Sequence, residues 1–168
     1  MSSLDLLSIG RVSVDLYAEQ PGVTMSDVTT FRKSIGGTAT NVAVATARYG
    51  HAVALATRVG DDQFGRYVAD ALRNTFNVDP RFVAAHPTLK TPLAFAELDP
   101  PEDPTIIFYR EPAAPDMEIE TTPQLLDAVD TARIFWIPAS RFAFDRSRTT
   151  VTELLQRRNR KHHTVLDL

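Results

Sequence analysis

The feature that most constrains the fold is the order in which apolar runs and amphipathic segments follow one another. The apolar run 4–9 ends at Gly10 and is typical of a buried strand. A helix with a stripe of small residues is expected over 39–49, a second buried strand over 53–59, and a helix with one apolar face over 62–74. This β-α-β-α order predicts a parallel sheet with right-handed crossovers. The same order resumes near the end, where we expect a short helix from Pro123, then strand 133–137, helix 145–161 and strand 164–168.

The segments between these units follow a different pattern. Val12, Val14 and Leu16 alternate with polar residues, which is typical of a half-exposed strand, and a further strand is expected over 28–35. Segments 91–98 and 105–110 are separated by a proline-rich turn and predict a hairpin. We therefore expect a small second sheet, formed by residues 12–35 and 91–110, inserted in one α/β domain that spans 1–168.

The sequence Gly36-Gly37-Thr38-Ala39-Thr40-Asn41 lies at the predicted junction between a strand and a helix. Paired glycines let a ligand approach the backbone closely, and the helix behind them begins with free N–H groups. Asn41 offers both a donor and an acceptor, which suits a sugar hydroxyl. A tight turn with a helix cap is the alternative. The segment lacks the lysine of a P-loop and the three-glycine spacing of a dinucleotide site.

Asp15 and Ser13 share the polar face of the half-exposed strand. A carboxylate there can accept hydrogen bonds from two sugar hydroxyls, so Asp15 is a candidate ligand-binding residue and Ser13 a weaker one. The alternative is a pair of solvated strand residues. Arg110 ends a strand of the second sheet and is a candidate for holding a carboxylate by paired hydrogen bonds, or else an ordinary surface arginine.

Charge and composition exclude several other functions. The formal net charge of -3 and the pI near 5.8 give no general attraction to nucleic acid or an anionic membrane. There is no cysteine, no basic and apolar leader, and no apolar run of about 20 residues, so a soluble cytoplasmic protein is expected. We interpret Asp61 and Asp62 as helix caps rather than metal ligands, and the basic residues of 157–161 as a solvated helix end. His162 and His163 would point apart on a strand, so no metal site is expected.

The glycine-rich segment and its surroundings resemble a known family. Gly36, Gly37, Ala39, Asn41, Ala43, Gly50 and Gly60 match the N-terminal signature of the ribokinase-type (phosphofructokinase B) carbohydrate kinases, and the resemblance runs from about Leu4 to the last residue. It implies a ribokinase-like fold: a partial doubly wound, mainly parallel sheet flanked by helices, with a small β-sheet lid. It also implies that Asp15, Gly36, Gly37 and Asn41, with Ser13, bind the sugar.

Three phrases narrow the resemblance within that family. Residues 57–62, 108–116 and 163–168 are most similar to kinases of 5-dehydro-2-deoxygluconate, a keto acid of inositol breakdown. The resemblance then implies phosphorylation of a terminal hydroxyl, with Arg110 on the substrate carboxylate. A fructokinase and a 2-keto-3-deoxygluconate kinase are the alternatives within the family.

The family's Gly-x-Gly-Asp segment, which supplies the catalytic base, does not occur among the seven glycines of this sequence. The resemblance places that segment, the adenine pocket and the sites for ATP and Mg²⁺ in a C-terminal half. We therefore expect no catalytic or cofactor-binding residue here, and an inactive, truncated chain. A non-catalytic fragment that binds sugar weakly, or forms a homodimer through its lid strands, is the competing hypothesis.

Overall fold

The computed structural model describes residues 3–168, and its centre is a five-stranded sheet in which all strands are parallel. The spatial order is β5-β4-β1-β8-β9. The bounds are β1 Leu6–Ile9, β4 Val53–Gly60, β5 Val83–His86, β8 Ile134–Pro138 and β9 His163–Asp167. The parallel sheet was predicted, whereas β5 was missed because its four residues carry no clear apolar alternation.

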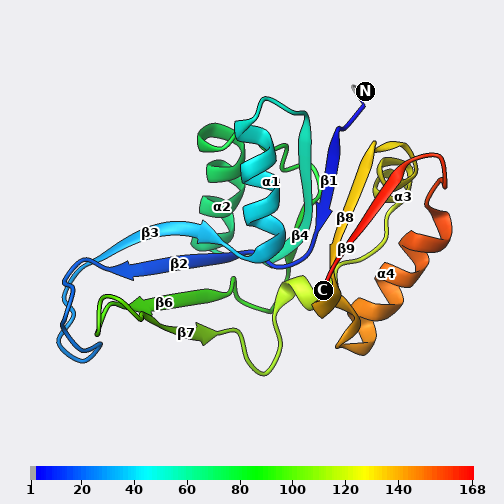
Figure 1. Cartoon of the computed structure of the whole chain (residues 1–168). Coiled ribbons are helices and arrows are strands. Elements are labelled where there is room, and N and C mark those ends of the chain that lie inside the picture. The colour runs from blue at the N-terminus through cyan, green and yellow to red at the C-terminus, as the bar shows by residue number, and fades with distance from the viewer. Residues whose placement is uncertain (1–2) are drawn as a thin grey trace.

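Helices cover both faces of this sheet, as Figure 1 shows. One face packs against α1 (Thr38–Arg48) and α2 (Gln63–Asp70), which continues as a π-helical turn over Ala71–Thr75. The other face packs against α3 (Pro123–Thr131) and α4 (Asp145–Arg157). Side chains alternate across β1, so Leu6 joins the first core while Leu7 and Ile9 join the second.

The end of α1 and the start of α2 follow local capping chemistry, whereas α4 ends earlier than the sequence predicted. Gly50 follows α1 with φ +85°, and the Asp62 side chain accepts a hydrogen bond from the Gly65 N–H at the start of α2. Helix α4 ends at Arg157, four residues before the predicted end. Arg158 is buried, which corrects the prediction that the whole basic run is solvated.

The Arg158 guanidinium donates hydrogen bonds to the backbone carbonyls of residues 129, 132, 133 and 163. These carbonyls lie at the end of α3 and at the starts of β8 and β9. Arg158 is therefore a structural cation that holds three elements together.

The second sheet is the lid, with spatial order β3-β2-β6-β7. Its strands are β2 Ser13–Ala18, β3 Phe31–Gly36, β6 Leu93–Glu97 and β7 Thr105–Tyr109. Strands β6 and β7 form the predicted hairpin, and β2 pairs with β3 antiparallel and with β6 parallel. In Figure 1 the lid projects from the end of the central sheet where β1 and β8 finish.

Candidate functional site

The predicted site residues lie where the lid joins the carboxyl ends of the central strands. β1 ends at Ile9, the chain enters the lid at Ser13, and it leaves the lid through Gly36 to begin α1 at Thr38. In open α/β sheets, ligands bind beyond the carboxyl ends of the strands. The topology thus brings the glycine pair and the polar face of β2 to the edge where a ligand is expected.

Asp15, Ser13 and Gly36 form one contact group. The Ser13 hydroxyl donates to Asp15 Oδ1 at 2.6 Å, and Ser13 lies opposite Gly36 in the pairing of β2 with β3. A Cβ added at Gly36 would lie 1.9 Å from Asp15 Oδ2, so the carboxylate occupies the space that any other residue would fill. Burial raises the pKa of Asp15, while the Ser13 hydrogen bond and the charge of Arg11 oppose that rise.

Gly37 allows the backbone to turn from β3 into α1. Its φ is +106°, and a Cβ there would lie 2.4 Å from the Arg11 carbonyl oxygen. The Thr40 hydroxyl donates to the same oxygen at 3.0 Å, which ties the start of α1 to the segment after β1. Helix α1 has no side-chain cap and no acidic residue in its first turn. Asn41 lies in that turn with an exposed side chain, and its N–H donates to the Gly37 carbonyl at 2.8 Å.

A polar cavity of about 240 Å³ lies beside these residues, and we call it the arginine cavity. Arg11, Arg110, Arg141, Asp116, Thr38 and Ala39 line it, together with residues 117, 138, 140 and 144.

Asp116 is fully buried and pairs with two of these arginines. Nη2 of Arg110 lies 3.0 and 2.9 Å from its two carboxylate oxygens, and Nη1 of Arg141 lies 3.3 Å from Oδ2. Arg110 therefore has a protein carboxylate as its partner, a contact that the sequence did not predict. Burial lowers the pKa of Arg141, an effect that Asp116 opposes and Arg110 reinforces.

The lid connects Asp15 with the arginine cavity. Asp15 lies opposite Ala94 in β6, and Ala94 lies opposite Phe108 in β7, so the three side chains share one face. The Arg11 guanidinium lies 5.0 Å from the centre of the Phe108 ring, on which it stacks. The cation that lines the cavity thus rests on the same lid face as the carboxylate.

The remaining predictions concern Asp61, Asp62 and metal ligands. Asp62 caps α2 and also accepts hydrogen bonds from the N–H and hydroxyl of Thr91, at 2.9 and 2.8 Å, just before β6. Asp61 is exposed and lies 3.8 Å from Arg66. Within residues 3–168, no three His, Asp or Glu side chains cluster closely enough to hold a metal ion. No helix of the same range is both long and apolar enough to cross a membrane.

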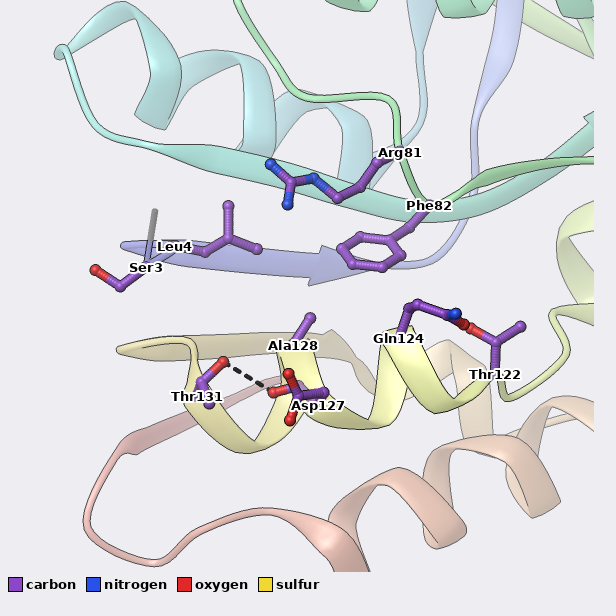
Figure 2. Close-up of a pocket in the computed structure, with 9 residues that line it drawn as sticks. All are labelled: Ser3, Leu4, Arg81, Phe82, Thr122, Gln124, Asp127, Ala128 and Thr131. Carbon is purple, nitrogen blue, oxygen red and sulfur yellow. Dashed lines mark hydrogen bonds between the residues drawn. The ribbon is translucent and has the colours of Figure 1, made fainter. Parts of the chain in front are cut away.

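A larger cavity, of about 810 Å³, lies elsewhere. Figure 2 shows it between Phe82, the segment that leads into β1, and the side of α3 that carries Gln124 and Asp127. Leu4 lines it, so the cavity adjoins the amino end of β1, at the opposite end of the strand from Gly10. Its position separates it from the glycine pair, and we do not assign the ligand to it.

A parallel α/β sheet with a lid at its carboxyl edge, and polar groups gathered beneath that lid, defines a class of small-molecule-binding α/β proteins. The sequence profile of the pfkB family carbohydrate kinases matches residues 3–168. The chain belongs to this family.

Curated relatives and solved structures agree with that assignment. The chain is 32% identical over 164 residues to the 5-dehydro-2-deoxygluconokinase of Bacillus thuringiensis strain Al Hakam, covering 97% of this chain and 48% of the relative. It is 33% identical over 163 residues to the 5-dehydro-2-deoxygluconokinase of Bacillus anthracis, covering 96% and 48%. The chain thus spans about half the length of these relatives.

Two solved structures have a similar fold. A sugar kinase from Pyrococcus horikoshii in complex with ATP has a TM-score of 0.79 at 28% identity, over 97% of this chain and 52% of that one. A fructokinase from Xylella fastidiosa has the same TM-score and identity, over 97% and 50%. The ribokinase-like fold class predicted from the sequence is therefore confirmed.

Sequence reasoning missed Arg11, Asp116 and Arg141. Arg11 had one usable signal, since it directly follows the glycine that ends a buried strand. Asp116 and Arg141 are 25 residues apart, and no local pattern relates them.

Proposed function

We propose that the chain is the sugar-binding half of an ATP-dependent carbohydrate kinase that phosphorylates a terminal hydroxyl of a sugar acid, 5-dehydro-2-deoxygluconate. The observation that carries the proposal is the packing of the Asp15 carboxylate over Gly36 within the lid, next to the carboxyl edge of the central sheet. The similarity to relatives named 5-dehydro-2-deoxygluconokinase supports the choice of substrate. A cytoplasmic location, where ATP is available, goes with this proposal.

Each candidate residue has a distinct role in the proposal. Asp15 accepts hydrogen bonds from two sugar hydroxyls, and Ser13 keeps the carboxylate in place through its 2.6 Å hydrogen bond. Gly36 and Gly37 bring backbone groups close to the sugar, while the amide of Asn41 donates and accepts. Arg110 contributes positive charge toward the substrate carboxylate although Asp116 is its protein partner.

The contribution of these residues to phosphoryl transfer is positioning. Holding a hydroxyl in line with the transferred group lowers the barrier without any covalent step by the protein. We assign ATP and Mg²⁺ to the part of the relatives that this chain does not span. The sequence has no Gly-x-Gly-Asp segment, so we assign no catalytic base to residues 1–168.

The test is an ADP-release assay on the polypeptide encoded by the complete reading frame, with ATP, Mg²⁺ and one sugar at a time. We expect turnover with 5-dehydro-2-deoxygluconate, less with 2-keto-3-deoxygluconate and least with fructose. Absence of turnover with every sugar contradicts the kinase proposal. Preference for fructose contradicts only the choice of a sugar acid. The 168-residue chain, assayed in parallel, is expected to release no ADP.

A second function, self-association through the lid, is favoured by the outer strand of that sheet. Ile106, Phe108 and Tyr109 in β7 are 45%, 45% and 64% exposed, and large apolar groups gathered on an edge strand are a common site of pairing. Sedimentation of the chain and of Ile106→Glu tests this function. We expect a dimer that the substitution dissociates, and a monomeric unsubstituted chain contradicts it.

A further inference from the structure

The arginine cavity holds more positive charge than its own residues balance. Arg11, Arg110 and Arg141 contribute three guanidinium groups, and Asp116 is the carboxylate among the lining residues. Within residues 3–168, no carboxylate lies within ion-pair distance of Arg11. Even when Asp15 on the adjoining lid face is counted, one positive charge remains.

Unused hydrogen-bond donors point the same way. The Arg141 side chain is 5% exposed, yet its Nε–H has no partner, and the Nε–H of Arg110 is also buried without one. A buried N–H without a partner costs about 1–3 kcal/mol, so such a group is an available donor for a ligand. Thr38 and Ala39 add the uncapped amino end of α1, where the helix dipole favours an anion.

We propose that the arginine cavity binds the carboxylate of the sugar acid, and that Arg11 and Arg141 determine specificity for acids over neutral sugars. This inference rests on the proposed function and extends it to residues that the sequence did not indicate. A single excess charge matches a carboxylate better than a doubly charged phosphate, which would meet repulsion from both Asp15 and Asp116. A volume of about 240 Å³ suits one end of a sugar acid rather than a nucleotide.

Asp116 positions the two arginines that it contacts. Its oxygens bind Arg110 from the end of the lid and Arg141 from the turn after β8, so the guanidinium groups are fixed before a ligand enters. Arg11 has no such partner and rests on Phe108. Substitution of Arg11 therefore removes a charge from the cavity while leaving the buried ion pairs intact, which makes it the informative variant.

The test is calorimetric titration of the 168-residue chain, without ATP, using D-gluconate, the neutral polyol D-glucitol and inorganic phosphate. We expect gluconate to bind at least about tenfold more tightly than glucitol, because one hydrogen bond to a charged group contributes about that much affinity. Arg11→Gln should remove most of this preference and leave glucitol binding unchanged. Arg66→Gln, which removes an exposed arginine of α2, should keep it.

A second measurement covers Arg141, whose substitution can disturb the fold. The NMR signal of its Nε–H in the unsubstituted chain should shift with gluconate and stay fixed with glucitol. The proposal is overturned if gluconate fails to bind, if it binds no better than glucitol, if phosphate binds more tightly, or if Arg11→Gln leaves the preference intact.

These outcomes are separate from those of the kinase assay. Gluconate binding that depends on Arg11, in a protein that phosphorylates no sugar, keeps the carboxylate site and removes the kinase proposal. Turnover of sugar acids by the complete polypeptide, with acid preference unaffected by Arg11→Gln, keeps the kinase proposal and removes the carboxylate site.

Discussion

Replacement of Gly36 by alanine tests the geometry on which the proposed sugar site depends. The new Cβ would lie 1.9 Å from Asp15 Oδ2 and 2.6 Å from its Cγ. Real Cβ contacts essentially never fall below 3.0 Å, so the carboxylate must retreat by at least about 1 Å. Because the obstructing atoms belong to the end of a side chain, Asp15 can rotate away while the backbone stays in place.

This retreat has different consequences for stability and for binding. The Ser13 hydrogen bond is strained or lost, and the half-buried carboxylate turns toward water, so we expect a stability loss of about 1 kcal/mol. The two hydrogen bonds that we propose between Asp15 and sugar hydroxyls would be misplaced together, and at about 1.5 kcal/mol each their loss should raise the sugar Kd by roughly a hundredfold.

Gly37→Ala is the matched comparison. Its Cβ would meet the Arg11 carbonyl oxygen at 2.4 Å, and a φ of +106° is strained for alanine. Backbone must move, so we expect a loss of about 3 kcal/mol in the free energy of unfolding. Urea unfolding and gluconate calorimetry measure both variants. Equal stability losses in the two variants, with normal binding by Gly36→Ala, would refute the reasoning.

Three further substitutions test other contacts. Asp15→Asn keeps an acceptor for Ser13 but removes a carboxylate whose pKa is raised by burial. Ionisation of that carboxylate lowers the stability of the native chain as pH rises, so the variant should equal or exceed the native free energy of unfolding at pH 7 and lose that advantage on acidification. The variant should also bind sugar poorly. A variant less stable at pH 7 than the native chain contradicts this. Asp62→Ala removes the cap of α2 and both contacts to Thr91, so urea unfolding should show a loss of about 2–4 kcal/mol. Burial opposes a low pKa at Asp62, yet hydrogen bonds from Thr91 and Gly65 lower that pKa. The stability that Asp62 contributes should therefore be lost as pH falls through the lowered pKa. A stability loss in Asp62→Ala that persists in full at low pH contradicts this. Arg158→Met leaves buried carbonyls without a donor and should lower the free energy of unfolding by about 3 kcal/mol. Arg157→Met, at an exposed position, should lower it by less than about 0.5 kcal/mol. Similar losses in the two variants contradict the structural role of Arg158.

Patterns confined to short segments predicted much of the fold. Alternating apolar runs and helical stripes predicted the parallel sheet and the helices that flank it, because one face of each element has to be buried. Asp62 was predicted correctly as a helix cap because a cap depends on its immediate neighbours. The lid hairpin followed from proline-rich turn chemistry between two strands.

Only part of the candidate site could be predicted: local patterns indicated some of its residues, whereas contacts that no local pattern relates were not foreseen. The sequence indicated Ser13, Asp15 and the glycine pair as candidates because a strand face and a strand-to-helix junction are local features, and the structure brings Ser13, Asp15 and Gly36 into contact. Their role in sugar binding stays a prediction. The structure adds that Asp15 packs directly over Gly36, which explains why a glycine is needed at a position with no unusual φ. Arg110 was chosen as a ligand-binding residue, but its partner Asp116 was not foreseen.

The sequence by itself predicted most of the strands and helices, where several of them end, and which polar residues are candidates for a site at the carboxyl edge of the sheet. Tertiary structure alone decided that β5 joins the sheet, that Arg158 holds α3, β8 and β9 together, and that Arg110 and Arg141 meet at Asp116. The physical reason is that propensity, capping and alternation act over a few residues. The partner of a buried charge is set by how distant elements pack.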